Sequence, residues 1–260
     1  MQTAHPKVTL CVLSYNTGIY AEAASQSAMA SNYENLEVVC VDDCSTDASA
    51  LSLMRLSKEL GFAFHENPRN LGIPETCNMG LSLATEKYFI VLGDDLLMPS
   101  RIRKDEEILE ENPEIGLVCS RAKIIGSDGL DLETDSDWSD NRAEGLFQES
   151  PEAVWLRGSR VFTPTVTYRT QTLRDSGGWD SRYDFEDRPM FIRLAQDGFK
   201  GWHRAEVTTV YRRHEKTTPP SSERAFSGKS LTSYRTFSCP CPPGKSRSSS
   251  LLKFTIGCSS

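Results

Sequence analysis

Residues 36–47 read LEVVCVDDCSTD, a short apolar run that ends in acidic and hydroxyl side chains. A nearly continuous apolar run is typical of a strand that is covered on both faces. Ser and Thr within residues 43–47 offer caps for a following helix, and residues 47–60 have helical spacing. This stretch therefore predicts a strand, a polar loop and a helix in succession.

The same succession is found on both sides of this stretch. Residues 8–13 and 88–92 are further apolar runs, while residues 19–30 and 74–84 have helical spacing. Repeated strand-helix-strand units with apolar strands are typical of an α/β fold with a central, mostly parallel sheet. We therefore expect a sheet of this kind in the first half of the chain.

The second half mixes strands and helices less regularly. A charged helix is expected from Pro99 to about Asn112, a strand over residues 115–125 and a turn at residues 127–129. We find no internal repeat, and we expect one catalytic domain over residues 1–222.

Composition excludes several classes of protein. The 260 residues carry a formal charge of −7 and the pI is near 5.3, a poor match to a phosphate backbone, so we expect no nucleic-acid partner. The longest apolar run is far shorter than the roughly 20 residues that span a bilayer, and residues 1–7 lack a signal-peptide pattern. We expect a soluble, cytoplasmic protein whose 8 cysteines are mostly small core residues.

Residues 223–260 differ from the rest of the chain. From residue 225 onward there is no acidic residue, and serine is abundant. This basic tail is expected to be disordered. Three interpretations stay open: a solvated basic end, a peripheral membrane contact through its Lys and Arg, or a terminus that replaced a longer one.

Polar residues follow three of the expected strands. Ligands of such sheets bind beyond the carboxyl ends of the strands. Two acidic pairs that meet at one edge repel each other unless a cation, a sugar or a base lies between them, although a single pair after a strand is more often a helix cap. The polar segments are Ser14-Tyr15-Asn16, Asp42-Asp43 and Gly93-Asp94-Asp95.

Six segments together resemble the inverting family 2 glycosyltransferases, which have the GT-A fold. The resemblance covers roughly residues 6–222 and depends on the order and spacing of the segments. They are residues 8–16, 38–47, 70–102, 168–180, 185–198 and 210–222.

The resemblance implies a nucleotide site at residues 14–16 and 42–43. Tyr15 resembles the aromatic residue that packs on the nucleotide base, and Asp42 resembles the carboxylate that accepts a hydrogen bond from the base, which fits uracil. Ser14 and Asn16 flank Tyr15. Asp43 either assists Asp42 or caps the next helix, and Tyr15 as a plain core residue is the alternative.

The resemblance also implies a divalent ion, Mg²⁺ or Mn²⁺, held against the donor diphosphate. Asp94 and Asp95 resemble the metal-binding acidic motif, and His214 resembles the histidine that reaches the metal or the phosphates from the far side. Leu92 stands where the first acid of that motif is expected, and Cys77 stands where an arginine is usual.

Glu186 and Asp187 resemble the acidic pair whose Asp is the general base. A sugar hydroxyl is a poor nucleophile, so a carboxylate opposite the leaving diphosphate must take its proton. The alternative is that both are acids favoured in the first turn of a helix. Trp179 is expected either to form a wall for the acceptor sugar or to lie in the core.

Together, these residues predict an enzyme that transfers a sugar from a nucleotide sugar to a saccharide or lipid-linked acceptor. A UDP-sugar is the favoured donor. Because Leu92 and Cys77 depart from the family pattern, a second interpretation stays open, in which the protein is an inactive relative that only binds nucleotide sugar or glycan. A nucleotidyltransferase has little support, because no Gly-rich, Lys- or Arg-bearing phosphate loop lies near the first strand.

Overall fold

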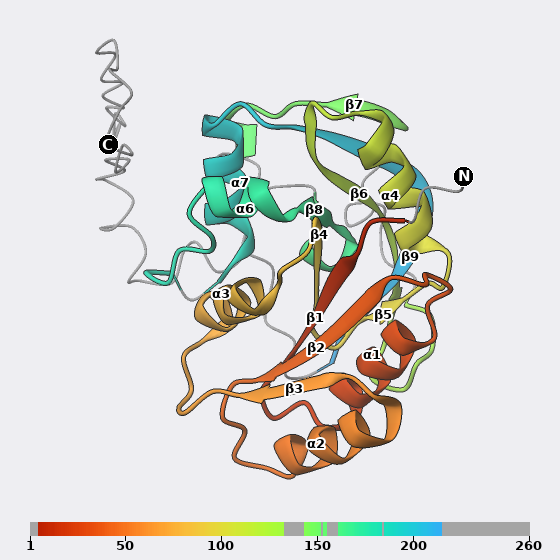
Figure 1. Ribbon diagram of the computed structural model, residues 1–260, viewed down its shortest axis with the longest axis vertical. Coiled ribbons are helices and arrows are strands. Elements are labelled where there is room, and N and C mark those ends of the chain that lie inside the picture. Colours follow the sequence, from red (N-terminus) through yellow and green to blue (C-terminus); the bar gives the residue numbers. More distant parts are fainter. Residues whose placement is uncertain (1–4, 133–142, 152, 155–160, 184, 215–260) are drawn as a thin grey trace, which may run out of the picture. The chain divides into compact units, whose positions relative to one another are not determined.

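A computed structural model describes residues 5–132, 143–151, 153–154, 161–183 and 185–214 (Figure 1). The predicted basic tail lies outside these residues. Within them, no helix is long and apolar enough to cross a membrane.

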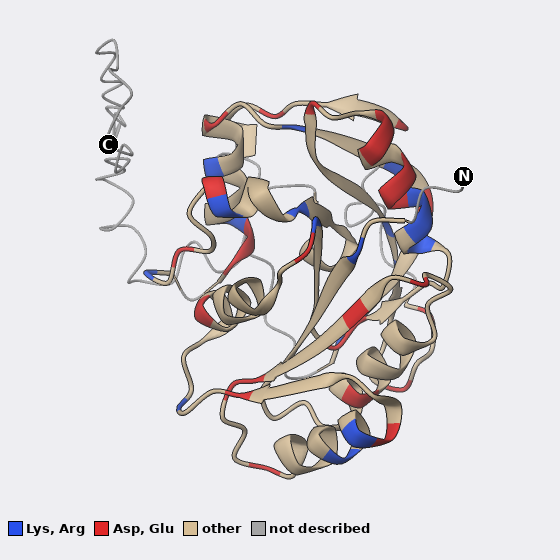
Figure 2. Cartoon of the chain, in the orientation of Figure 1, with Lys and Arg blue, Asp and Glu red and all other residues tan. Residues whose placement is uncertain are grey.

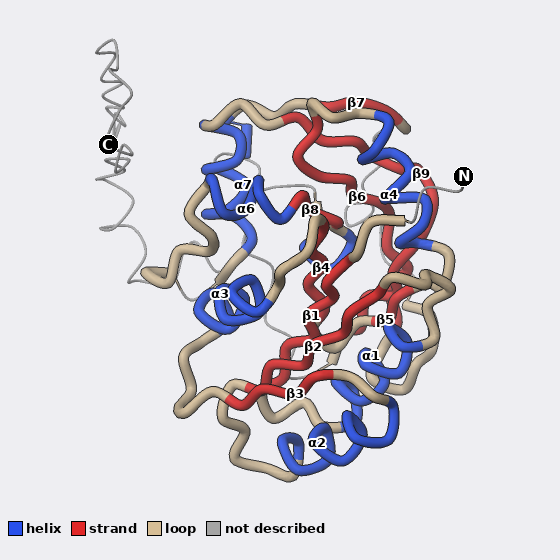
Figure 3. The backbone as a smooth tube through the Cα atoms, in the orientation of Figure 1, coloured by secondary structure: helices blue, strands red, loops and turns tan. Residues whose placement is uncertain are grey.

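The described strands form one mixed sheet in the order β3-β2-β1-β4-β8-β6-β9-β5, and β7 pairs with β9 (Figure 3). The first four strands in this order are parallel, and β8 runs antiparallel to both β4 and β6. The bounds are β1 Val8–Ser14, β2 Leu36–Asp42, β3 Ala63–Glu66, β4 Tyr88–Leu92, β5 Leu96–Leu97, β6 Ile115–Ile125, β7 Gly145–Phe147, β8 Thr167–Arg169 and β9 Lys200–Arg212.

Helices cover both faces of the sheet. One face packs against α1 (Ile19–Met29), α2 (Ser49–Leu60) and α4 (Arg101–Glu111). The other face packs against α3 (Ile73–Leu83), α6 (Thr170–Asp175) and α7 (Asp187–Gln196), with the short 3₁₀ turn Thr163–Thr165 ahead of β8. Because both faces are covered, the central strands β1 and β4 are apolar along nearly their whole length.

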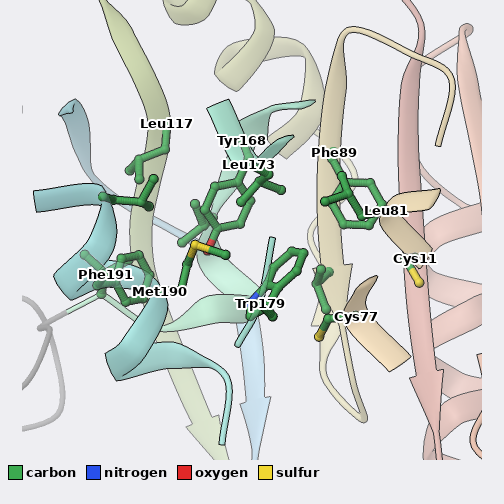
Figure 4. Packing of buried hydrophobic residues seen from close by; sticks show 14 of the residues in the cluster. Cys11, Cys77, Leu81, Phe89, Leu117, Tyr168, Leu173, Trp179, Met190 and Phe191 are labelled. Atoms are coloured by element: carbon green, nitrogen blue, oxygen red, sulfur yellow. The ribbon is translucent and has the colours of Figure 1, made fainter. Parts of the chain in front are cut away.

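Alternation along β1 divides the core between these two helix layers. Leu10 and Val12 point toward the layer of α1, whereas Cys11 points toward Cys77 and Leu81 of α3. Figure 4 shows the core on the side of α3, α6 and α7, where Phe89 of β4 and Tyr168 of β8 lie near Trp179.

The structure confirms the predicted strands and helices of the first half, with shifts of a few residues at their ends. The strand β3 was missed, because only one of its four residues, Phe64, is strongly apolar and none of them is fully buried. The expected core position of the cysteines is confirmed for Cys11, Cys40, Cys77 and Cys119, which are all buried. Burial raises the pKa of the Cys11 thiol to about 12.

Candidate functional site

The parallel ladders bring the three predicted polar segments to one edge of the sheet. Ser14 lies opposite Asp42, and Val12 lies opposite Leu92. The loops that leave β1, β2 and β4, at residues 14–18, 42–49 and 93–95, are therefore neighbours. We call these three loops the carboxyl edge.

Side-chain hydrogen bonds join the first two loops of the carboxyl edge. Asn16 has a φ of 53°, a left-handed conformation that Asn tolerates. Its backbone N–H donates to Ser45 Oγ at 2.9 Å, and its Oδ1 accepts the backbone N–H of Thr46 at 2.8 Å. Asn16 therefore orders the loop after β2, and this role differs from the expected direct contact with a nucleotide.

Asp42 also serves this loop. It has no exposed surface, and its two carboxylate oxygens accept the Ser45 backbone N–H and hydroxyl, each at 2.7 Å. In the structure the Asp42 carboxylate is thus turned inward to Ser45, and its expected hydrogen bond to a base stays a prediction.

Asp43 neither assists Asp42 nor caps α2. Its oxygens accept the backbone N–H groups of Leu71 and Gly72 and the side-chain amide of Asn67, all at 2.8 Å. Asp43 therefore fixes the loop that leads into α3. The first residue of α2, Ser49, instead donates its backbone N–H to Asp47 at 2.9 Å.

Tyr15 alone among the predicted nucleotide-site residues presents a large surface. Its exposed fraction is 44%, which excludes the core alternative. Ser14 is only 3% exposed, and its carbonyl accepts the Asp43 N–H at 2.8 Å, so it supports the edge from inside.

The predicted metal-site residues Asp94 and His214 meet across 120 residues of sequence, with His214 Nε2 in contact with Asp94 Oδ2. The His214 ring stacks on Tyr20 of α1, with ring centroids 4.6 Å apart and planes inclined by 19°. The Arg212 guanidinium lies 5.0 Å from the centre of the same Tyr20 ring. Tyr20 therefore packs against two side chains at and just after the end of β9, Arg212 and His214.

Asp95 lies deeper than Asp94. It is 3% exposed, and its Oδ1 accepts the Arg212 backbone N–H at 2.9 Å. Burial and, next, the charge of Asp94 raise the pKa of Asp95 well above its ordinary value. Asp95 is thus engaged by the backbone of β9, and its predicted role as a metal ligand stays a prediction.

Asp94 and His214 fit a divalent ion as two of its ligands. Carboxylate oxygen and imidazole nitrogen suit Mn²⁺, and the carboxylate suits Mg²⁺. Among the described residues, no three His, Cys, Asp or Glu side chains gather at one point. The remaining ligands of such an ion would therefore have to come from a bound diphosphate and water.

Glu186 and Asp187 lie where α7 begins, as predicted. Asp187 is the first residue of the helix, and its Oδ1 accepts the backbone N–H of Arg188 at 2.6 Å. The helix carries one acidic residue, Asp187, together with two arginines, Arg188 and Arg193 (Figure 2).

Charges of both acidic pairs act on two tyrosines, Tyr211 of β9 and Tyr168 of β8. Burial raises the pKa of Tyr211, and the charges of Asp95, Asp94 and Glu186 raise it further. The pKa of Tyr168, which is buried in the core, is raised mainly by burial. The charges of Glu186 and Asp187 also raise it. Charges from residues that lie far apart in sequence therefore act on Tyr211.

The structure places Trp179 in the core. Its exposed fraction is 2%, and its ring centroid lies 6.2 Å from those of Phe89 and Tyr168 (Figure 4). The core alternative is thus confirmed, and an indole with so little exposed surface does not form the expected wall for an acceptor sugar.

Sequence reasoning missed Tyr20 as a neighbour of the site. Its stacking on His214 depends on how α1 docks beside the end of β9, and no local pattern marks it. Tyr211 and Arg212 belong to residues 210–222, one of the segments that carry the family resemblance, but the resemblance did not predict their contacts.

Comparison with known proteins identifies the family to which the chain belongs. The family model described as "Glycosyl transferase family 2" matches residues 9–214. The chain belongs to this family. It therefore carries a glycosyltransferase domain, and the match includes every predicted site residue.

Individual relatives agree with this assignment. The putative glycosyltransferase EpsE of Bacillus subtilis is 25% identical over 215 residues, covering 78% of this chain and 71% of the relative. An uncharacterized glycosyltransferase of Haemophilus influenzae is 34% identical over 122 residues, which is 46% of this chain and 38% of the relative. The chain thus spans well under half of that second relative.

Solved structures show the fold. Staphylococcus aureus TarS residues 1–349 with UDP-GlcNAc superpose with a TM-score of 0.64 at 18% identity, over 80% of this chain and 59% of that one. The mannosyltransferase PcManGT of Pyrobaculum calidifontis, with GDP-Man and Mn²⁺, gives 0.60 at 19% identity, over 83% and 59%. This family 2 member has the GT-A fold.

Proposed function

We propose that the chain transfers a sugar, with inversion, from a UDP-sugar to a hydroxyl of a saccharide or lipid-linked acceptor. One observation carries the proposal: the acidic pair after β4 and Glu186, just before α7, all lie close enough to Tyr211 of β9 for their charges to raise its pKa. A displacement reaction needs a stabilised leaving group on one side and a proton acceptor on the other. Two separate acidic pairs can supply both.

Tyr15 is the residue we assign to the nucleotide base. It is exposed at the carboxyl edge, where ligands of parallel sheets bind. The network of Asn16, Ser45 and Asp42 supports this assignment, because it holds the loops on either side of the ring in one conformation. Two TarS structures are described with UDP and UDP-GlcNAc, which favours a uridine donor here.

Asp94 and His214 are the residues that would hold a divalent ion. When bound, the ion would offset the negative charge that grows on the departing diphosphate. The structure described for PcManGT with GDP-Man and Mn²⁺ supports a metal in this fold. Arg212 packs on Tyr20 beside this site, and its positive charge would also favour a bound diphosphate.

Asp187 is the residue we assign as the general base, with Glu186 beside it. Asp187 takes the proton of the acceptor hydroxyl as the oxygen attacks the anomeric carbon, and the bond to the diphosphate breaks on the opposite face. Asp187 is partly exposed at the start of α7, as a group that must meet an acceptor has to be. Inversion follows from this single displacement.

A donor-hydrolysis screen tests the proposal. UDP-glucose, UDP-galactose, UDP-N-acetylglucosamine and representative GDP- and dTDP-sugars are incubated with the protein, with and without Mn²⁺, and nucleoside diphosphate release is measured. We expect release from one uridine donor in the presence of Mn²⁺, and loss of that release in Asp187→Asn. Binding of a donor by calorimetry without any release would instead support the inactive relative.

A further inference from the structure

The turn formed by residues 177–180 lies directly before the segment that carries Glu186 and Asp187. Gly177 and Gly178 have φ values of 81° and 70°, in the left-handed region that favours glycine. A Cβ atom on Gly178 would lie 2.5 Å from Asn78 Oδ1. The turn therefore depends on a close approach to α3.

Asn78 of α3 holds this turn through both ends of its amide. Its Nδ2 donates to the Trp179 carbonyl at 2.7 Å, and its Oδ1 accepts the Trp179 backbone N–H at 2.8 Å. An amide side chain offers a donor and an acceptor together, as this paired contact requires. Because Asn78 satisfies the backbone of Trp179, the indole can stay buried in the core.

Arg193 of α7 holds the same turn from the other side. Its Nη1 donates to the carbonyls of Ser176 and Gly178, each at 2.8 Å, and its Nη2 donates to Asp180 Oδ2 at 3.2 Å. Arg193 belongs to the helix that begins with Asp187. The turn is thus fixed between α3 and α7.

The start of α3 is itself fixed to the carboxyl edge. Asp43 accepts the N–H groups of Leu71 and Gly72, and Gly72 immediately precedes the helix. Helix α3 therefore connects the loop after β2 with the turn 177–180, and hydrogen bonds fix it at both places.

We propose that Asn78 is a positioning residue for Asp187, acting through the turn 177–180 and α7. This inference rests on the proposed function, because it needs Asp187 to be the base. Asn78 does not touch the reacting atoms. It sets the distance between the donor, which the carboxyl edge holds, and the carboxylate, which α7 carries, and a displacement of about 1 Å can cost roughly 100-fold in rate.

The test compares Asn78→Ala and Asn78→Asp with the control Ser82→Ala. Ser82 is an exposed residue of the same helix that bonds only within α3, to Met79. The nearly isosteric Asp keeps an acceptor for the Trp179 N–H but loses the donor to the Trp179 carbonyl, so it remains informative if the Ala variant does not fold. Measurements are single-turnover transfer, UDP affinity by calorimetry and hydrogen exchange of the Trp179 amide.

We expect transfer to fall roughly 10- to 100-fold in both Asn78 variants, with UDP affinity unchanged and with faster exchange of the Trp179 amide in Asn78→Ala. Ser82→Ala should behave like the unmodified protein. If Asp187→Asn abolishes transfer but neither Asn78 variant slows it, the positioning role is overturned while the proposed function stands. If Asp187→Asn leaves transfer intact, the proposed base is wrong, and faster exchange in the Asn78 variants then reports only a structural contact.

Discussion

The first two loops of the carboxyl edge and the turn 177–180 are both held by side-chain hydrogen bonds, but over very different distances in sequence. At the carboxyl edge Asp42 is bonded to Ser45, three residues away, and Asn16 is bonded to Thr46, 30 residues away. The turn depends on Asn78, which precedes Trp179 by 101 residues. The first two loops of the edge are therefore joined directly to each other, whereas the turn is assembled by the docking of helices.

This difference separates two kinds of defect. A change at the carboxyl edge should alter how the donor and its ion bind, because those loops present Tyr15 and Asp94. A change around the turn or at the start of α7 should alter the rate of transfer at unchanged donor affinity. Four predictions test this separation, beginning with the largest expected effect.

Removal of divalent ions should have the largest effect and should act at the carboxyl edge. We expect EDTA to abolish nucleoside diphosphate release and added Mn²⁺ to restore it, since the diphosphate leaves poorly without a countercharge. His214→Ala should raise the Mn²⁺ concentration needed, both for release and for stabilisation by UDP in a thermal shift assay. Full activity in EDTA would show a metal-independent site in which Arg212, Arg213 or His214 supplies the charge.

Asp187→Asn should have the next largest effect and should act on rate alone. The substitution keeps the shape of the side chain and removes its basicity, so we expect transfer to fall by roughly 100-fold or more with donor affinity preserved. Glu186→Gln is the matched control and should cost less. If the Glu186 change were the more damaging at equal affinity, the two roles would be exchanged.

Tyr15→Ala should weaken UDP binding by roughly 10-fold, because stacking of a base on an aromatic ring contributes about 1–3 kcal/mol. Tyr15→Phe keeps the ring and should bind UDP almost normally. Calorimetric titration with UDP and Mn²⁺ measures both. Equal affinity in all three proteins would remove Tyr15 from the nucleotide site.

The sequence predicted the sheet and the neighbourhood of the site, since apolar runs and the polar residues after them are local patterns. It did not predict which of those polar residues face outward. Asp42 and Asp43 occupy the end of a strand, where a carboxylate can serve either a ligand or the backbone of its own loops, and in the structure both serve the loops.

The buried position of Trp179 could not be predicted for a related reason. An indole next to two glycines can line a surface or fill a core, and its burial depends on Asn78 and on the aromatic residues of β4 and β8. The same holds for Tyr20, which stacks on a histidine from the far end of the described chain. Contacts that depend on the docking of distant elements leave no local pattern.

The smallest expected effect concerns the charges around the turn. The pKa of Asp180 is lowered, first by the hydrogen bond from Arg182 and also by the charges of Arg182 and Arg193. A lowered pKa means that the ionised carboxylate stabilises the folded state above its ordinary pKa of about 3.9, and that this stabilisation is lost as the pH falls through the lower folded value.

Asp180→Asn should therefore lower the free energy of unfolding at pH 7 by less than about 1 kcal/mol, because the Arg182 side chain is 68% exposed and solvent screens the pair. The difference from the unmodified protein should shrink as the pH falls toward 3. Urea unfolding followed at pH 7, 5 and 3 measures it, with Asp175→Asn on the exposed surface of α6 as the control. A difference that stayed constant down to pH 3 would mean that Asp180 acts through size and neutral hydrogen bonds, and the turn would then be held without any contribution from charge.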